Sequence, residues 1–209
     1  MTIRHSAPAI GAIILLTAIR QLSAGADGAG AQAAQGFIAA NRLDERWQGD
    51  PLRQLDSAEL RAAYPRQEFY FTFKAPPLPP GAPMPELIEK HKAAMAEYKK
   101  HSLRMTMGVD AAQNVAAFQS AADFNHGLMP VKNENDAKIA AAAILSLIGN
   151  DDVYPEIVGA DKITVTAGPS GWTCALKQAR GFDGTVVFGV NGSVVSAAKT
   201  LNYVPPLPS

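Results

Sequence analysis

The chain has 209 residues, which is enough for one domain with a sizeable core but not for two large domains. Its 19 basic and 19 acidic residues cancel, so no overall field attracts nucleic acid, and we expect no nucleic-acid partner. The single cysteine, Cys174, excludes an internal disulfide framework and a cysteine-built metal site, because each needs several thiolates. We expect no metal and no cofactor.

Residues 1–26 have the order of regions found in a secretory signal peptide. Arg4 precedes an apolar run at 7–19, and an A-x-A cleavage site follows at 24–26, with a second one at 31–33. The run is shorter than the ~20 residues of a membrane span. We therefore expect a periplasmic or secreted protein with no stable transmembrane span after processing. A transit peptide that directs the protein to an organelle, an uncleaved anchor and an ordinary buried helix are the alternatives.

Small residues dominate positions 27–36, and we expect a flexible Ala/Gly tether there, because small side chains bury too little surface to order a chain. Residues 37–74 are predicted to form a helical segment, broken at 49–51, and then an aromatic strand. The strand prediction rests on Phe69, Phe71 and Phe73, which alternate with other residues and so share one face. Asp56 and Glu59 predict a capping box for the last short helix before this strand.

A proline-rich connector is predicted at 75–85, where the segment PPLP favours extended polyproline II. The same four residues recur near the C-terminus, where no later element needs a connection. Tyr203, Pro205 and Pro206 are therefore predicted to dock on a partner, and deletion of this tail is expected to leave folding intact.

Residues 86–209 are predicted to be the remainder of a single α+β domain with a Pro-rich tail. Its expected elements are an amphipathic helix over 86–100 with one face on the core, a strand over 103–109, a short helix near 115–122 and a strong helix over 136–148 capped by Gly149. The 136–148 helix is apolar almost all round, so we expect it to be enclosed inside the domain.

The last ~45 residues predict an antiparallel β-meander, because short alternating apolar runs follow one another. Asn191-Gly192 between two such runs predicts a hairpin in which both turn residues have positive φ. The fold class is thus α+β, with helices packed on an antiparallel sheet and a C-terminal β-meander or hairpin.

Few residues carry a chemical signal. Cys174 shares a strand face with Trp172, and His126 is the only histidine outside the leader and the lysine-rich helix, so a Cys174/His126 pair is the single candidate for nucleophilic catalysis. Cysteine also packs well in cores, and we expect a buried structural thiol. Trp172 is a candidate binding aromatic.

The expected function is that of an exported, non-catalytic binding or assembly protein of the cell envelope or extracellular space, with a protein partner or self-assembly through strand edges or Pro-rich segments. The alternative is a small periplasmic hydrolase that uses Cys174 with His126.

Overall fold

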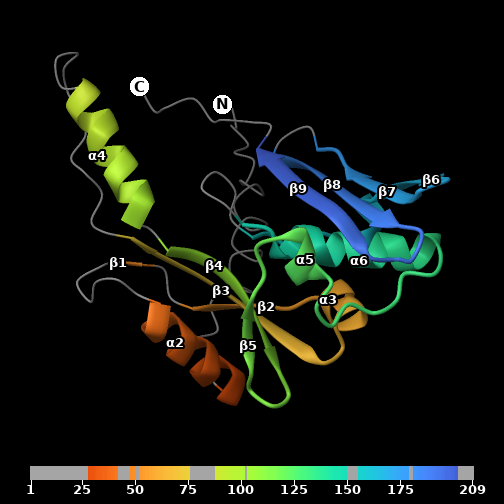
Figure 1. Ribbon diagram of the computed structural model, residues 1–209, viewed down its shortest axis with the longest axis horizontal. Helices are drawn as coiled ribbons and strands as arrows, with labels where there is room; N and C mark the ends of the chain where they lie inside the picture. Colours follow the sequence, from red (N-terminus) through yellow and green to blue (C-terminus); the bar gives the residue numbers. More distant parts are fainter. Residues whose placement is uncertain are drawn as a thin grey trace, which may run out of the picture.

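The computed structural model describes residues 28–41, 48–49, 52–75, 88–101, 103–149, 155–178 and 181–201. Helices and two antiparallel sheets make up this part of the chain (Figure 1). The predicted α+β class is therefore confirmed. The predicted leader and both PPLP segments lie outside the described residues.

The N-terminal sheet is built around two long paired strands, β3 (Gln67–Ala75) and β4 (Leu103–Asp110). Two short strands, β1 (Gln48–Gly49) and β2 (Arg53–Leu55), pair with the other side of β3, and β5 (Val115–Ala117) pairs with β4. The predicted aromatic strand is confirmed as β3, since Phe69 and Phe71 are both buried on one face.

The C-terminal sheet is the predicted meander. Its strands are β6 (Thr164–Gly168), β7 (Gly171–Leu176), β8 (Phe182–Gly189) and β9 (Val194–Leu201), in the spatial order β6-β7-β8-β9. Each strand pairs with the one before it, so β6 and β9 are the two edges. A short 3-10 helix, η2 (Ala160–Lys162), leads into β6.

Helix α6 (Glu134–Leu147) lies between the two sheets (Figure 1). All residues from Ala140 to Leu147 are buried, and they share one core with Phe71 of β3 and Phe188 of β8. Gly184 of β8 allows α6 to lie close to this strand, because a Cβ at position 184 would lie 2.7 Å from the side chain of Leu145. The prediction of an enclosed helix is confirmed.

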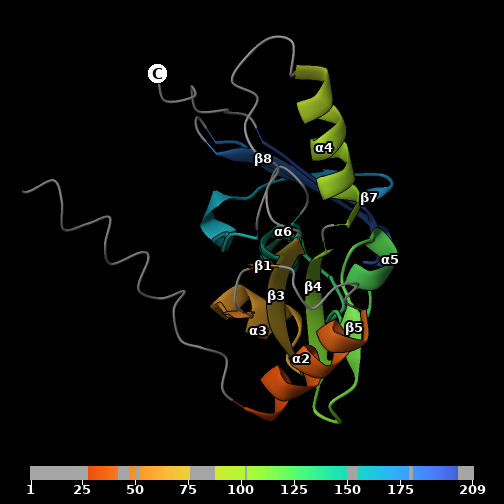
Figure 2. The same cartoon turned by 90° about the vertical axis from the view of Figure 1, so that its left-hand side faces the viewer.

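Helix α2 (Ala29–Asn41) covers the opposite face of the N-terminal sheet (Figure 2). Ala31 and Ala34 are 1% and 0% exposed, and they pack with Ile38 against Tyr70 and Met107. The predicted tether over 27–36 is therefore wrong from Ala29 onward. Small side chains bury little area by themselves, but here they let a helix lie close against a strand pair that supplies the larger side chains.

Two other local predictions are wrong for a similar reason. The predicted helix over 37–64 is interrupted by the short strands β1 and β2, which form their hydrogen bonds with β3. The last part of it does form a helix, α3 (Ala58–Ala63), but its N-cap is Ser57 rather than Asp56. The predicted helix near 115–122 begins as strand β5, followed by α5 (Ala121–Phe124). Pairing with a neighbouring strand overrode local helix preference in both places.

The end of α6 also differs from expectation. Helix α6 ends with Ile148 in an extended conformation, and Gly149 is not in the left-handed region. Helix α4 (Ile88–His101) extends away from the two sheets (Figures 1 and 2). Tyr98 on its predicted core face is half-buried, and the side chains of Ile88 and Met95, on which the predicted packing depends, lie outside the described residues.

Candidate interaction site

Cys174 lies in β7 and faces α6. It is 0% exposed, and its Sγ donates a hydrogen bond to the Ala137 carbonyl at 3.6 Å. Burial, with a smaller contribution from the nearby Glu134 carboxylate, raises the pKa of the thiol to about 12. A thiol in this setting is protonated at neutral pH, so the expectation of a structural role has physical support.

His126 lies on the exposed turn that follows α5. Its carbonyl accepts a hydrogen bond from Gln67 Nε2 at 3.1 Å, and its ring interacts electrostatically with Asp110 at the end of β4. These neighbours belong to the N-terminal sheet, whereas those of Cys174 belong to α6. The structure therefore gives the two candidate catalytic residues different surroundings. Among the residues described, no three metal-ligating side chains cluster.

Trp172, the other predicted site residue within the described ranges, is half-buried on β7. Its side chain packs on the inner face of the C-terminal sheet, opposite Ala167 of the edge strand β6. The remaining candidates, Tyr203, Pro205 and Pro206, lie outside the described residues.

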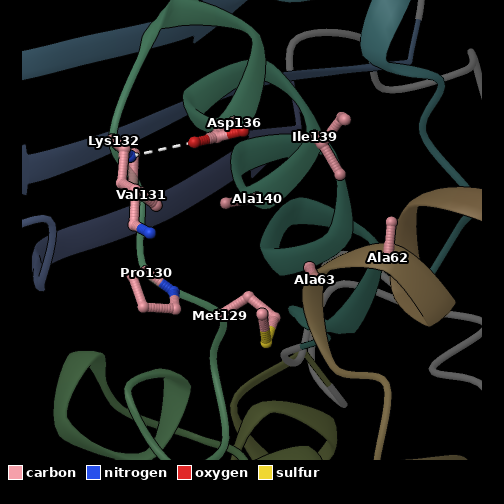
Figure 3. A pocket seen from close by; sticks show the side chains of 9 residues that line it. All are labelled: Ala62, Ala63, Met129, Pro130, Val131, Lys132, Asp136, Ile139 and Ala140. Atoms are coloured by element: carbon pink, nitrogen blue, oxygen red, sulfur yellow. Dashed lines mark hydrogen bonds between the residues drawn. The ribbon is translucent and has the colours of Figure 1, made fainter.

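A pocket of about 330 Å³ lies beside the N-terminus of α6, between α3 and the segment before α6 (Figure 3). Nine residues line it: Ala62, Ala63, Met129, Pro130, Val131, Lys132, Asp136, Ile139 and Ala140. Its one carboxylate already accepts a hydrogen bond from the Lys132 backbone at 3.0 Å, while the Asp136 N–H is capped by Asn133. The Asp136 carboxylate and N–H thus serve the start of the helix.

The outer face of the C-terminal sheet is exposed and nearly free of charge. Seven exposed side chains on it are small and uncharged: Thr164, Thr166, Thr173, Thr185, Ser196, Ala198 and Thr200. The half-buried Asp183 is the one ionisable residue of the described strands on this face, and Lys177 pairs with it at 2.9 Å. A strand added at an edge of this sheet would extend a nearly uncharged surface.

Edge strand β9 carries two backbone features that resist strand addition. The side-chain amide of Asn125 accepts from the Val194 N–H at 2.7 Å and donates to the Val194 carbonyl at 3.0 Å, so it occupies the edge groups of that residue. A β-bulge follows, because Val187 and Phe188 pair with Ser196 and Val194 and leave Val195 without a partner. Occupied edge groups and bulges both weaken an edge as a template.

A buried lysine is the third such feature of β9. Lys199 is 5% exposed, its Nζ donates to the Leu145 carbonyl at 3.1 Å, and it lies 3.7 Å from the centre of the Phe182 ring. The Leu145 carbonyl lies in the last turn of α6, so Lys199 also caps that helix. An inward-pointing charge on an edge strand disfavours pairing with a further strand. The sequence did not single out Lys199. The signal was its position two residues after Ala197 on the same strand, which places both side chains on the inner face.

The buried position of Lys199 predicts that the free energy of unfolding rises with pH in the alkaline range. Burial lowers its pKa from 10.5 to about 8, with the Glu156 carboxylate partly opposing this shift. Between these pH values the unfolded chain binds one more proton than the folded one, so the free energy of unfolding increases with pH. Relative to Lys199→Met, the wild type should gain about 1–2 kcal/mol from pH 8 to pH 9.5 in urea unfolding.

Taking the difference between the two proteins removes the contribution of the Cys174 thiol, which has the opposite sign. Lys199→Arg is the matched control, because a guanidinium stays charged throughout this range. A difference curve that is flat with pH would contradict the buried position of the amino group.

Edge strand β6 has none of these features. Its five residues, TVTAG, contain no charge and no proline, and within the described ranges β7 is its only neighbouring strand. On the inner face, Val165 and Trp172 are only partly buried, so apolar surface continues up to this edge. Within the part of the chain that the structure describes, the two edges of this sheet therefore differ: β9 carries features that resist strand addition, and β6 is open.

The register shows which groups of β6 are free to pair. The Gly189 N–H donates to Ser193 O at 2.8 Å, so the odd-numbered residues of β8 direct their backbone groups at β9 and the even-numbered ones at β7. The even-numbered residues of β7 pair with the even-numbered residues of β8, so the odd-numbered residues of β7 direct their backbone groups at β6. Their partners are the even-numbered residues of β6, which therefore direct their own groups at β7. The N–H and C=O groups of Val165 and Ala167 consequently point away from the sheet.

In the described part of the chain no helix is long and apolar enough to cross a membrane. Comparison with models of protein families, with curated proteins and with solved structures gave no match.

Proposed function

We propose that the protein is an exported, non-catalytic binding or assembly protein that accepts a partner strand along β6. The observation that carries the proposal is the contrast between the two edges of the C-terminal sheet. β9 has the edge groups of Val194 bonded to Asn125, a bulge and an inward lysine, whereas β6 presents the backbone groups of Val165 and Ala167, unpaired among the described residues, beside half-buried apolar side chains. Proteins protect the edges that must stay unpaired and leave open those that dock.

The export part of the proposal rests on the signal-peptide pattern of residues 1–26, and α2 bears on where the leader is cut. Cleavage after Ala33 would remove the first turn of α2 together with the buried Ala31, whereas cleavage after Ala26 leaves the whole helix. We therefore propose that the mature chain begins at Asp27.

The test is photo-crosslinking in the producing cell. A photoreactive phenylalanine analogue replaces Thr166 on the outer face of β6, and the exported fraction is irradiated and examined by mass spectrometry. We expect a covalent adduct, and we expect the recovered chain to start at Asp27. Ala167→Pro in the same chain should abolish the adduct, because it removes one outward N–H and leaves the pairing with β7 intact.

Matched controls carry the same analogue at Ala198 on β9 or at Thr185 in the middle of the sheet, where no adduct is expected. Adducts at all three positions would indicate contact with the face rather than the edge. If no adduct forms at Thr166, the proposed function is wrong. A mature chain that retains Met1 would remove the basis for export.

A further inference from the structure

We infer that the strand that pairs with β6 is β6 of a second copy of this chain, related by a two-fold axis through Thr166. This inference rests on the proposed function and names its partner. Antiparallel pairing about that axis places Val165 opposite Ala167 of the copy, and Ala167 opposite Val165 of the copy. These are the residues whose N–H and C=O groups point outward, so the pairing satisfies all of them in two hydrogen-bonded pairs.

The side chains fit the same register. Thr166 would face Thr166 of the copy on the outer face as a non-hydrogen-bonded pair, the closer of the two pair types in an antiparallel ladder, and Thr–Thr is a favourable cross-strand pair. On the inner face, Val165 and Ala167 of each copy would meet, beside the partly buried Trp172. No residue of β6 is charged, so two copies approach without like-charge repulsion.

Symmetry favours a second copy over an unrelated strand. An isologous contact uses the same patch on both chains, and β6 is self-complementary in both its outward groups and its side chains. The product is one continuous eight-stranded sheet whose two outer edges are both β9, the strand with the bulge, the inward Lys199 and the Val194 groups bonded to Asn125. Assembly therefore ends at two copies. A five-residue strand pair buries less than the ~1,200 Å² of a standard interface, so the dimer should be weak.

The test is a charge-swap pair at Thr166, followed by sedimentation equilibrium at roughly 100 µM, a concentration suited to a weak interface. The wild type should contain dimer. Thr166→Lys and Thr166→Glu should each weaken self-association at least about tenfold, because like charges lie directly opposite on the axis. An equimolar mixture of the two variants should recover association to wild-type strength or better.

Ala198→Lys is the control, since it adds the same charge to the outer face at the protected edge and should dimerise like the wild type. Thermal unfolding of each variant checks that Thr166 substitutions on this exposed position leave the fold intact. The inference is overturned if the wild type is monomeric, if Thr166→Lys dimerises like the wild type, or if mixing restores nothing.

The two proposals can fail separately. A Thr166 adduct with the mass of two copies supports both of them. An adduct with another mass, together with a monomeric wild type, overturns the second copy and leaves strand addition at β6 standing. No adduct and no dimer overturns both.

Discussion

Replacing Phe69 with alanine should lower the free energy of unfolding by about 3–5 kcal/mol, the largest loss we expect from any single core substitution of this type. Phe69 is 2% exposed and makes edge-to-face contacts with Tyr64 and Phe118, each at 5.1 Å between ring centroids. Both neighbours are hydrogen-bonded: Tyr64 donates its hydroxyl hydrogen to the Phe124 carbonyl at 2.7 Å, and the Phe118 N–H donates to the Thr106 carbonyl at 2.8 Å. The cavity therefore cannot close easily, and the aromatic contacts are lost as well.

The measurement is urea unfolding followed by circular dichroism, with a thermal midpoint as a second readout. For a chain of this size we expect the midpoint to fall by roughly 10 °C, given about 2–4 °C per kcal/mol. Phe73→Ala is the matched control, because Phe73 lies on the same strand and face but is only partly buried, with Arg104 over its ring at 4.5 Å. It should cost about 1 kcal/mol. Equal losses for the two variants would show that Phe69 is not at the centre of the core.

Gly192→Ala should destabilise the protein by about 2–3 kcal/mol, whereas Gln113→Gly should stabilise it by about 0.5–1 kcal/mol. Both residues hold the left-handed position of a three-residue hairpin loop, with φ of 76° and 64°. The loops have the same bonding: the Gly192 N–H donates to Gly189 O, and the Gln113 N–H donates to Asp110 O, each at 2.9 Å. Glycine adopts this conformation without steric cost, and a residue with a Cβ does not.

Gly192 has a second constraint that Gln113 lacks. A Cβ at Gly192 would lie 2.6 Å from the Val131 carbonyl oxygen, a backbone atom that cannot move aside without shifting the segment before α6. Urea unfolding of both variants gives the two signs directly. Gln113→Ala is the control: it keeps a Cβ at positive φ, so it should bring no gain. A stabilising Gly192→Ala would contradict the loop geometry.

The same hairpin shows how far the sequence reaches. Asn191-Gly192 predicted the hairpin, and the structure contains it, but the loop has three residues and only Gly192 has positive φ. Asn191 instead accepts hydrogen bonds from the backbone and hydroxyl of Ser193, at 3.1 and 2.7 Å. Local composition predicts that a chain turns, and the exact turn depends on the register that the two strands adopt.

The sequence by itself determined the elements whose signal is a period. Alternating phenylalanines predicted β3, and successive alternating apolar runs predicted the meander of β6 to β9. An apolar surface on nearly all sides of the 136–148 helix predicted that α6 is enclosed. Each of these patterns indicates which faces of an element are apolar. Those faces are buried in the fold because burial of apolar surface is the dominant favourable contribution to folding. The candidate site was not predictable in the same way: Trp172 was named, but Asn125, Lys199 and the open edge β6 were not.

Only the tertiary structure decided which surfaces meet. Ala31 and Ala34 became core residues because β3 and β4 supply the larger side chains that α2 needs, and residues 53–55 became a strand because β3 offers hydrogen bonds. The difference between edges β6 and β9 arises in the same way. It depends on Asn125 reaching Val194 across 69 positions, and on α6 ending where its last carbonyls can receive Lys199. Such contacts are set by the packing of distant segments, and no local pattern of residues records them.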